Sequence, residues 1–197
     1  MAAARLIARH PGAWRRAVAH PFLDAVRDGS LAQASFERWL SQDYLFIADL
    51  LAFQASLLAG APRAAQKTLA VGLVALEAEL TWFERSATER GLRLAGVRHP
   101  TTEAYRATLV RLREAGAEPA LTGLWTLERA YLEAWRGAAP GAPPFRPFVE
   151  HWTVPQFAGY VAGLEALAGD GPKAEMAFLE VCELERAFWE MAWTPDA

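Results

Sequence analysis

The sequence predicts an all-α protein, and three observations favour this class. Apolar residues recur at intervals of three and four, which is the spacing of one helix face. No Asn-Gly or Asp-Gly turn joins two alternating runs, so hairpin signals are missing. Several segments between turn residues are about 20 residues long or longer, as in a helical bundle. We therefore expect one domain over residues 1–197, built of about seven helices.

Turn residues divide the chain into these helices. The first is expected over residues 13–28, with a kink or break at Pro21. The others are expected over 34–59, over 63–90, from Thr101 or Thr102 to 115, from the turn at 116–119 to 136, over a segment broken near Trp152, and over 173–193.

Glycine and proline mark where these helices end. Gly60-Ala61-Pro62 stops the second helix, and Gly91 suits the left-handed position that follows the third. The segment 137–147, GAAPGAPPFRP, is the strongest loop signal in the chain. Gly169-Asp170-Gly171-Pro172 forms the last turn before the final helix.

Helix starts also leave local signals. Thr153 followed three residues later by Gln156 resembles a capping box, with Pro155 in the first turn. Two histidines, His20 and His99, directly precede prolines. Since proline is favoured at the first helical position, we expect both histidines to act at helix starts.

Composition excludes several classes of function. The formal net charge is -3 and no basic stripe is present, so we expect no nucleic-acid partner. A single cysteine, Cys182, excludes an intrachain disulfide and fits a reducing cytoplasm. The N-terminus lacks the apolar core of a signal peptide, and we expect no membrane partner.

Common cofactor and catalytic motifs are missing. The four histidines form no HExxH pair, and the repeated Glu-x-x-His pattern of di-iron bundles is absent, so we expect no metal. No phosphate-cradling GxxxxGK[ST] or GxGxxG loop and no GxSxG elbow occur. We expect the protein to work without a cofactor.

Three acidic residues share a helix face with apolar residues. Asp43 lies at helical spacing with Trp39 and Phe46, and burying an unpaired carboxylate is costly, so this aspartate needs a partner or a function. Glu128 and Glu185 show the same pattern on later helices. For each acid the alternative is a charge at the edge of an apolar stripe, exposed to solvent or paired with an arginine.

Both ends of the sequence resemble the TenA/thiaminase II family. HPFLDAVRDGSL at 20–31 and FERWLSQDYLF at 36–46 resemble the family's N-terminal signature, and ELERAFWEMAW at 183–193 resembles its ending. The resemblance implies a heme-oxygenase-like bundle that assembles as a dimer or tetramer. It also implies hydrolysis of thiamin or its aminopyrimidine breakdown product in the cytoplasm. Some members have been labelled transcriptional regulators, but the sequence offers no DNA-reading element.

The resemblance also implies roles for individual residues. Asp43 takes the place of the aspartate that holds the aminopyrimidine ring. Phe46 and Trp152 fall where the family stacks aromatics on that ring, and Tyr105 lies near a family tyrosine. Tyr131 is a further expected contact to the substrate, since it shares a helix face with the candidate acid in the same stretch.

The catalytic chemistry implied by the resemblance departs from that of the cysteine-type members. Those members carry a nucleophilic cysteine on the helix that begins near Ala120, where this chain has Gly123 or a neighbour. Cys182 lies elsewhere, and we expect it to be a bystander. Glu185 matches the catalytic acid of the family, and Glu128 is the candidate to activate water or to assist Glu185.

Two other functions remain open at this stage. The fold could serve as a non-catalytic protein that binds a pyrimidine or another small ligand. It could also support oxygen chemistry, as in heme oxygenase or pyrroloquinoline quinone synthase. A heme oxygenase needs an axial histidine on an early helix, for which His10 and His20 are the only candidates.

Overall fold

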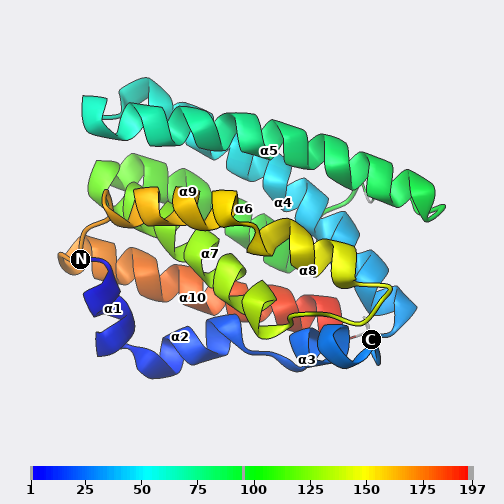
Figure 1. Cartoon of the computed structure of the whole chain (residues 1–197). Coiled ribbons are helices and arrows are strands. Elements are labelled where there is room, and N and C mark those ends of the chain that lie inside the picture. Colours follow the sequence, from blue (N-terminus) through cyan, green and yellow to red (C-terminus); the bar gives the residue numbers. More distant parts are fainter. Residues whose placement is uncertain (1, 95, 195–197) are drawn as a thin grey trace.

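A computed structural model describes residues 2–94 and 96–194 of the chain. Within these residues it contains ten helices and no strand (Figure 1). The helices are α1 Ala4–Arg9, α2 Pro11–Val18, α3 Pro21–Asp28, α4 Gln33–Gly60, α5 Arg63–Glu89, α6 Pro100–Ala115, α7 Ala117–Gly137, α8 Arg146–Thr153, α9 Pro155–Glu165 and α10 Pro172–Trp193. The all-α class is confirmed, with short helices added to the number expected.

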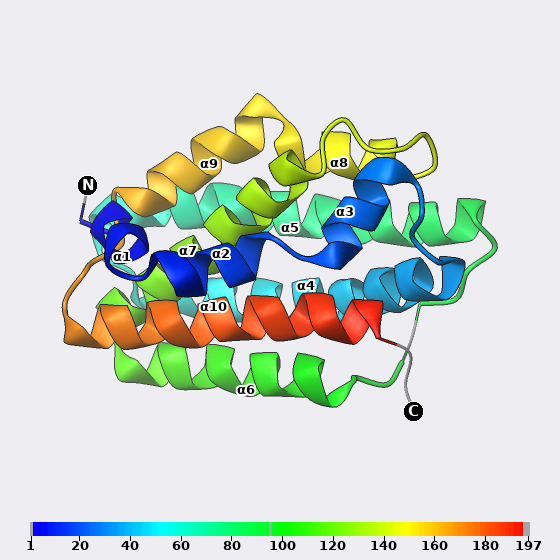
Figure 2. The same cartoon turned by 90° about the horizontal axis from the view of Figure 1, so that it is seen from below.

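The helices form a layered bundle. The most extensive contacts join α4 to α5 and α7 to α10. In Figure 1, α5 forms the upper edge, α8 and α9 cross in front of α7, and α1–α3 run along the lower edge. Seen from below in Figure 2, α10 and α6 lie side by side beneath α4. Helix α7 contacts α2, α3, α6, α8, α9 and α10, and most of its side chains are buried.

Helix α4 is long and strongly apolar. By length and composition it is apolar enough to cross a membrane, a test that the core helices of bundles also meet. Here its buried face includes Trp39, Asp43 and Phe46 and packs on α5, α6 and α10. This packing accounts for the apolar pattern, because the long stripe on α4 faces three neighbouring helices.

Several predicted helix ends are confirmed. The second and third helices end within one residue of the expected bounds, and Gly91 has a positive φ of 66° after α5. His20 and His99 are the N-cap residues of α3 and α6. Their Nδ1 atoms accept hydrogen bonds from the backbone N–H groups of Phe22 and Thr101, so both act at helix starts as predicted.

The break predicted at Pro21 is confirmed. The segment expected over 13–28 is two helices, α2 and α3, separated by Ala19 and His20 directly before that proline. Other predicted boundaries were wrong. His99, not Thr101 or Thr102, caps α6. The turn at 116–119 shrinks to Gly116, since Pro119 fits the first turn of α7, where a missing N–H costs nothing.

The predicted capping box at residues 153–156 was also wrong. The N-cap of α9 is Val154, which has no capping side chain. Thr153 instead donates its hydroxyl to the carbonyl of Val149, one turn earlier in α8. The break between α8 and α9 therefore comes from Pro155, whose ring disfavours helical backbone in the residue before it.

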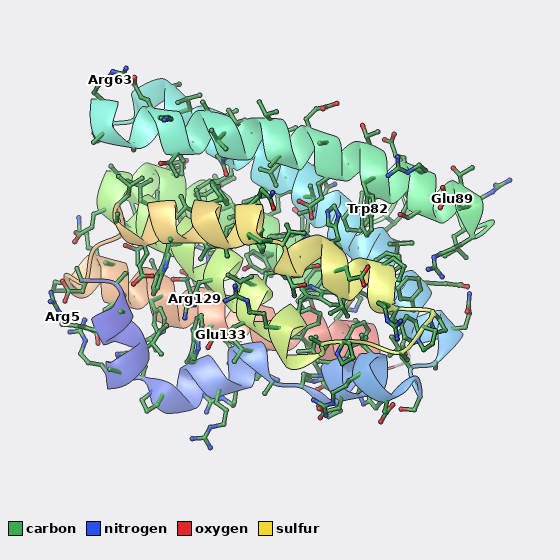
Figure 3. All side chains as sticks on the ribbon, viewed as in Figure 1. Arg5, Arg63, Trp82, Glu89, Arg129 and Glu133 are labelled. Carbon is green, nitrogen blue, oxygen red and sulfur yellow. The ribbon has the colours of Figure 1, made fainter. Side chains whose placement is uncertain are left out.

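Aromatic rings fill the centre of the bundle, as the tryptophan content predicted. Trp39, Trp125, Trp135 and Trp189 are almost fully buried. Trp152 stacks on Trp135 with ring centroids 5.0 Å apart. Figure 3 places Trp82 on α5 where this helix faces α8, and Trp82 stacks there on His151. The outer side of α7 is polar, and Figure 3 shows the Arg129–Glu133 ion pair there.

A close approach between helices is set by Gly72 on α5. A Cβ atom at this position would lie 2.1 Å from Nε2 of Gln54 and 2.5 Å from the hydroxyl of Tyr160. Gln54 is fully buried and donates to the carbonyl of Leu69, and Tyr160 donates to Oε1 of Gln54. This network joins α4, α5 and α9, and only glycine leaves room for it.

Candidate functional site

Asp43 on α4 has a partner. Its side chain is 1% exposed, and the hydroxyl of Tyr131 on α7 donates to its Oδ2 at 2.5 Å. Burial raises the pKa of Asp43 well above its ordinary value, and the Tyr131 hydrogen bond only partly opposes this. Burial therefore favours the neutral form of Asp43, and a tyrosine holds its side chain in place.

Glu185 on α10 is arranged in the same way. It is 5% exposed, and the hydroxyl of Tyr105 on α6 donates to its Oε1 at 2.5 Å. Burial raises the pKa of Glu185 to about 8. A carboxyl group with this pKa carries its proton at neutral pH and can donate it, as general acid catalysis requires.

Glu128 on α7 is 6% exposed. Within the described part of the chain its carboxyl group has no hydrogen-bond or ion-pair partner among the protein side chains and backbone. Burial, then the nearby carboxyls of Glu79, Glu185 and Asp43, raise the pKa of Glu128 well above its ordinary value. It is the strongest candidate for a carboxyl that stays neutral before a ligand arrives.

A fourth acid, Glu79 on α5, was missed by the sequence reasoning. The indole Nε1 of Trp152 on α8 donates to its Oε1 at 2.6 Å. Burial raises the pKa of Glu79 to about 7. A signal was present, since Glu79 lies three residues after Leu76 and four before Phe83, both buried.

These groups meet at one cavity with an empty volume of about 320 Å³, here called the carboxyl cavity. Its lining includes the acids Glu79, Glu128 and Glu185, the aromatic residues Phe46, Tyr131, Trp152 and Phe157, and the aliphatic residues Ile47, Leu50, Leu76 and Leu127. This volume includes space open to solvent, so the enclosed part of the cavity is smaller still.

The structure brings together most of the residues expected from the sequence. Phe46, Glu128, Tyr131, Trp152 and Glu185 line the carboxyl cavity. The remaining two expected residues lie one contact behind its wall: Asp43 bonds Tyr131, and Tyr105 bonds Glu185. Asp43 thus reaches the cavity through the phenol of Tyr131.

The four acids differ in how readily they ionise. Glu79, with a pKa of about 7, is close to half ionised at neutral pH, whereas Glu185, with a pKa of about 8, is mostly protonated. Both groups therefore titrate near neutral pH, as proton transfer to and from a substrate requires. The geometry therefore supports proton transfer to and from a small ring held between Phe46, Tyr131 and Trp152.

Cys182 lies apart from this chemistry. It is 2% exposed and does not line the carboxyl cavity. Burial, and then the neighbouring Glu185, raise the pKa of its thiol to about 12. Because the thiolate is the nucleophilic form, this cysteine is inert at neutral pH. Among residues 2–94 and 96–194, no group of three or more His, Cys, Asp or Glu side chains is placed to hold a metal ion.

The fold and the cavity together define a class: a heme-oxygenase-like α-helical bundle with buried acids around a small cavity. The sequence matches the TENA/THI-4/PQQC family over residues 7–195. The chain therefore belongs to this family.

Individual relatives cover nearly the whole chain. A Glycine max protein named "Probable bifunctional TENA-E protein" is 29% identical over 205 residues, covering 93% of this chain and 90% of its own. The crystal structure of a TenA homologue from Pyrococcus furiosus superposes with a TM-score of 0.92 at 30% identity, covering 98% of this chain and all of its own (100%).

Two more distant structures show the same fold. A protein of Silicibacter sp. TM1040 described as a TenA family transcription regulator has a TM-score of 0.89 at 19% identity, covering 98% of this chain and 96% of its own. A Sulfolobus solfataricus protein provisionally described as a TenA-like thiaminase has a TM-score of 0.84 at 16% identity, covering 96% and 94%.

Proposed function

We propose that the protein hydrolyses an aminopyrimidine or formylaminopyrimidine breakdown product of thiamin, using carboxyl groups instead of a cysteine nucleophile. The observation that carries this proposal is the carboxyl cavity. Its lining includes both Glu79, with a pKa of about 7, and Glu185, with a pKa of about 8. Membership of the TENA/THI-4/PQQC family and the naming of the Glycine max relative as a TENA-E protein support it.

Glu185 is proposed as the general acid. Hydrolysis of an aminomethylpyrimidine breaks the bond between the methylene carbon and the amine nitrogen, and water supplies the oxygen of the new alcohol. The departing nitrogen takes the proton of Glu185, which Tyr105 holds in position. Glu185 carries this proton at neutral pH because burial raises its pKa to about 8.

Glu79 is proposed as the base that takes a proton from the attacking water. Its Oε1 is bonded to Trp152, which leaves Oε2 for the water. Its pKa of about 7 lets the ionised form exist at neutral pH. Glu128, with its higher pKa, then acts as the neutral assistant of Glu185, one of the two roles that the sequence suggested for it.

The ring is proposed to lie among aromatic side chains. Phe46 and Trp152 flank the cavity, and Tyr131 presents its ring there while its hydroxyl bonds Asp43. Flat heterocycles stack favourably on such rings. Asp43 would hold the exocyclic amine of the pyrimidine in one of two ways. The amine either bonds the Tyr131 hydroxyl, or it replaces that hydroxyl as the donor to Asp43.

A product assay tests the proposal. The purified protein is incubated with 4-amino-5-aminomethyl-2-methylpyrimidine and with its N-formyl form, and the alcohol and the free amine are separated by chromatography. Turnover that disappears in Glu185→Gln but persists in Glu183→Gln is the expected result. Glu183 is a matched control, because it is exposed on the same helix and pairs with Arg186.

A non-catalytic binding protein is the second candidate. The observation in its favour is the inert Cys182 and the absence of a cysteine on α7. Calorimetry with the aminopyrimidine would support this reading if binding occurred without any product. It would be rejected by turnover of either compound.

Oxygen chemistry on a heme is disfavoured by the two early histidines. Nε2 of His20 contacts Oε2 of Glu190 at 3.1 Å, and its Nδ1 caps α3. His10 is engaged with Glu175. Neither lines the carboxyl cavity. Hemin is therefore expected to cause no Soret shift when it is added to the protein.

The cellular setting is also part of the proposal. We infer a cytoplasmic protein that acts on a small molecule and assembles as a homodimer or homotetramer. Light scattering after size exclusion would measure the mass directly. A monomeric mass at working concentration would contradict the proposed assembly without affecting the assignment of the cavity.

A further inference from the structure

A second concave space lies next to the carboxyl cavity, here called the outer groove. It has an empty volume of about 770 Å³, more than twice that of the carboxyl cavity. Val71, Ala75 and Ala78 of α5 form one side, and Val154, Phe157 and Tyr160 lie on the other, at and along α9. Val71 is 54% exposed and Val154 is 38% exposed, so this apolar surface faces solvent.

The outer groove and the carboxyl cavity meet at three side chains. Glu79, Trp152 and Phe157 line both spaces. Glu79 and Trp152 are bonded to each other, which fixes this part of the shared wall. A molecule that extends from the cavity into the groove must therefore pass between this bonded pair and Phe157.

The charges of the outer groove are few. Glu79 is the only acid in its lining. His151 also lines it, but burial lowers the pKa of His151 to about 4, so its ring is neutral at neutral pH. The groove thus offers an apolar surface whose single charge is negative and lies at the junction with the carboxyl cavity.

We propose that the outer groove binds an apolar aromatic substituent carried on the leaving nitrogen, so that the preferred substrates are secondary amines of the aminomethylpyrimidine. This inference rests on the proposed function, and it names a part of the substrate that the carboxyl cavity is too small to hold. The pyrimidine fills the cavity, the nitrogen lies beside Glu79 and Glu185, and the substituent covers Ala75 and Ala78.

The reaction balances for such a substrate. Water adds its oxygen to the methylene carbon, the bond from that carbon to the nitrogen breaks, and the products are the hydroxymethylpyrimidine and a primary amine. One proton passes from Glu185 to the nitrogen, and one passes from water to Glu79. Release of an apolar amine into a groove that opens to solvent would then free the site for the next turnover.

The test compares the parent aminomethylpyrimidine with its N-benzyl derivative. Dissociation constants are measured by calorimetry in the Glu185→Gln background, so that turnover does not interfere and binding is read even if no hydrolysis occurs. The N-benzyl compound is expected to bind about tenfold or more tightly than the parent, as for an added apolar group in a fitting site.

Ala75→Trp is the test variant, since a large ring at this exposed position fills the outer groove without entering the carboxyl cavity. It is expected to reduce the preference for the N-benzyl compound to about threefold or less. Ala64→Trp is the matched control, because Ala64 is exposed on α5 and lines neither space, and it should keep the full preference. Circular dichroism and thermal melting check that both variants fold.

Several outcomes would overturn the inference. One is equal affinity of the Glu185→Gln protein for both compounds. Another is a preference for the N-benzyl compound that survives Ala75→Trp. A change of oligomeric mass in Ala75→Trp with the preference kept would show that a second copy covers the groove. If the wild type bound the parent without forming product, the proposed hydrolase would be rejected. The groove would then be judged only by whether the N-benzyl compound binds more tightly than the parent. Binding of neither compound would reject both.

Discussion

Trp152 donates its indole hydrogen to Glu79 across 2.6 Å, although the two residues lie 73 positions apart on α8 and α5. This bond occupies one carboxyl oxygen of an acid whose pKa burial raises to about 7. It also joins α8 to α5 beside the outer groove. The properties of Glu79 therefore depend on the packing of α8 against α5.

The relative importance of Glu79 and Glu128 is directly testable. Glu79→Gln keeps a carbonyl that can accept the Trp152 bond but removes the base, so kcat is expected to fall about 100-fold or more. Glu128→Gln replaces a neutral acid by a neutral amide and is expected to cost less than about tenfold. Steady-state kinetics of both variants measures these changes in kcat. A larger fall in kcat for Glu128→Gln than for Glu79→Gln would make Glu128 the base.

The pH dependence of the reaction follows from the two assigned groups. Activity needs Glu79 ionised, which favours pH above about 7, and Glu185 protonated, which favours pH below about 8. The profile of kcat/KM is expected to be a narrow bell with its maximum between these values. Glu79→Gln should abolish the acidic limb of any residual activity, and a profile that stays flat from pH 6 to pH 9 would exclude both assignments.

Ionisation of Glu185 should lower the stability of the fold as pH rises. The pKa rises from 4.5 in an ordinary environment to about 8 in the fold, so the folded state holds a proton that the unfolded state releases. The free energy of unfolding therefore decreases as pH rises from about 4.5 to about 8. Glu185→Gln is expected to be more stable than the wild type by roughly 3 kcal/mol at pH 7, with little difference at pH 4. Urea melts at both pH values measure this.

The Tyr131–Asp43 bond is expected to matter for stability as well as for ligand binding. Tyr131→Phe leaves the buried Asp43 without its donor and should cost about 1–3 kcal/mol. Tyr44→Phe is the control, because Tyr44 donates to the exposed Glu84 at the surface, and it should cost about 0.5 kcal/mol or less. If chemical denaturation gave the same loss of unfolding free energy for both variants, the buried bond would contribute no more to stability than the surface bond.

Two glycines should respond in opposite directions to alanine. At Gly72 the new Cβ would lie 2.1 Å from Gln54, so Gly72→Ala is expected to destabilise the fold by about 1–3 kcal/mol. At Gly159, inside α9, no atom lies within 4 Å of the new Cβ, and Gly159→Ala is expected to stabilise by roughly 0.5–1 kcal/mol. Thermal melting of the pair distinguishes crowding from backbone entropy.

The fold was predictable where the helices are long. The helices expected over 34–59 and 63–90 match α4 and α5 closely, because glycine and proline mark their ends and their apolar faces span many turns. The six residues of α1 were not found, since so short a segment carries no clear period. The sequence predicted a kink or a break at Pro21 and could not choose between them, because one proline can cause either.

The candidate site was predictable only in part. Asp43, Glu128 and Glu185 stand out because each acid interrupts an apolar face, and Glu79 has the same spacing without a family motif to draw attention to it. Their partners could not be read from the sequence. Tyr131 and Tyr105 are hydroxyl donors at positions 88 and 80 residues from the acids they bond, and only the packing of distant helices selects them.

These separations bear on how the protein is made. Asp43, Glu79 and Tyr105 each bond a residue that is synthesised 73 to 88 positions later. On the ribosome, where the N-terminal part emerges first, the first member of each pair must wait in water for its partner. Burial of any of these polar groups before then would leave it unsatisfied. The carboxyl cavity is therefore expected to be among the last parts of the bundle to close, after α10 has left the exit tunnel.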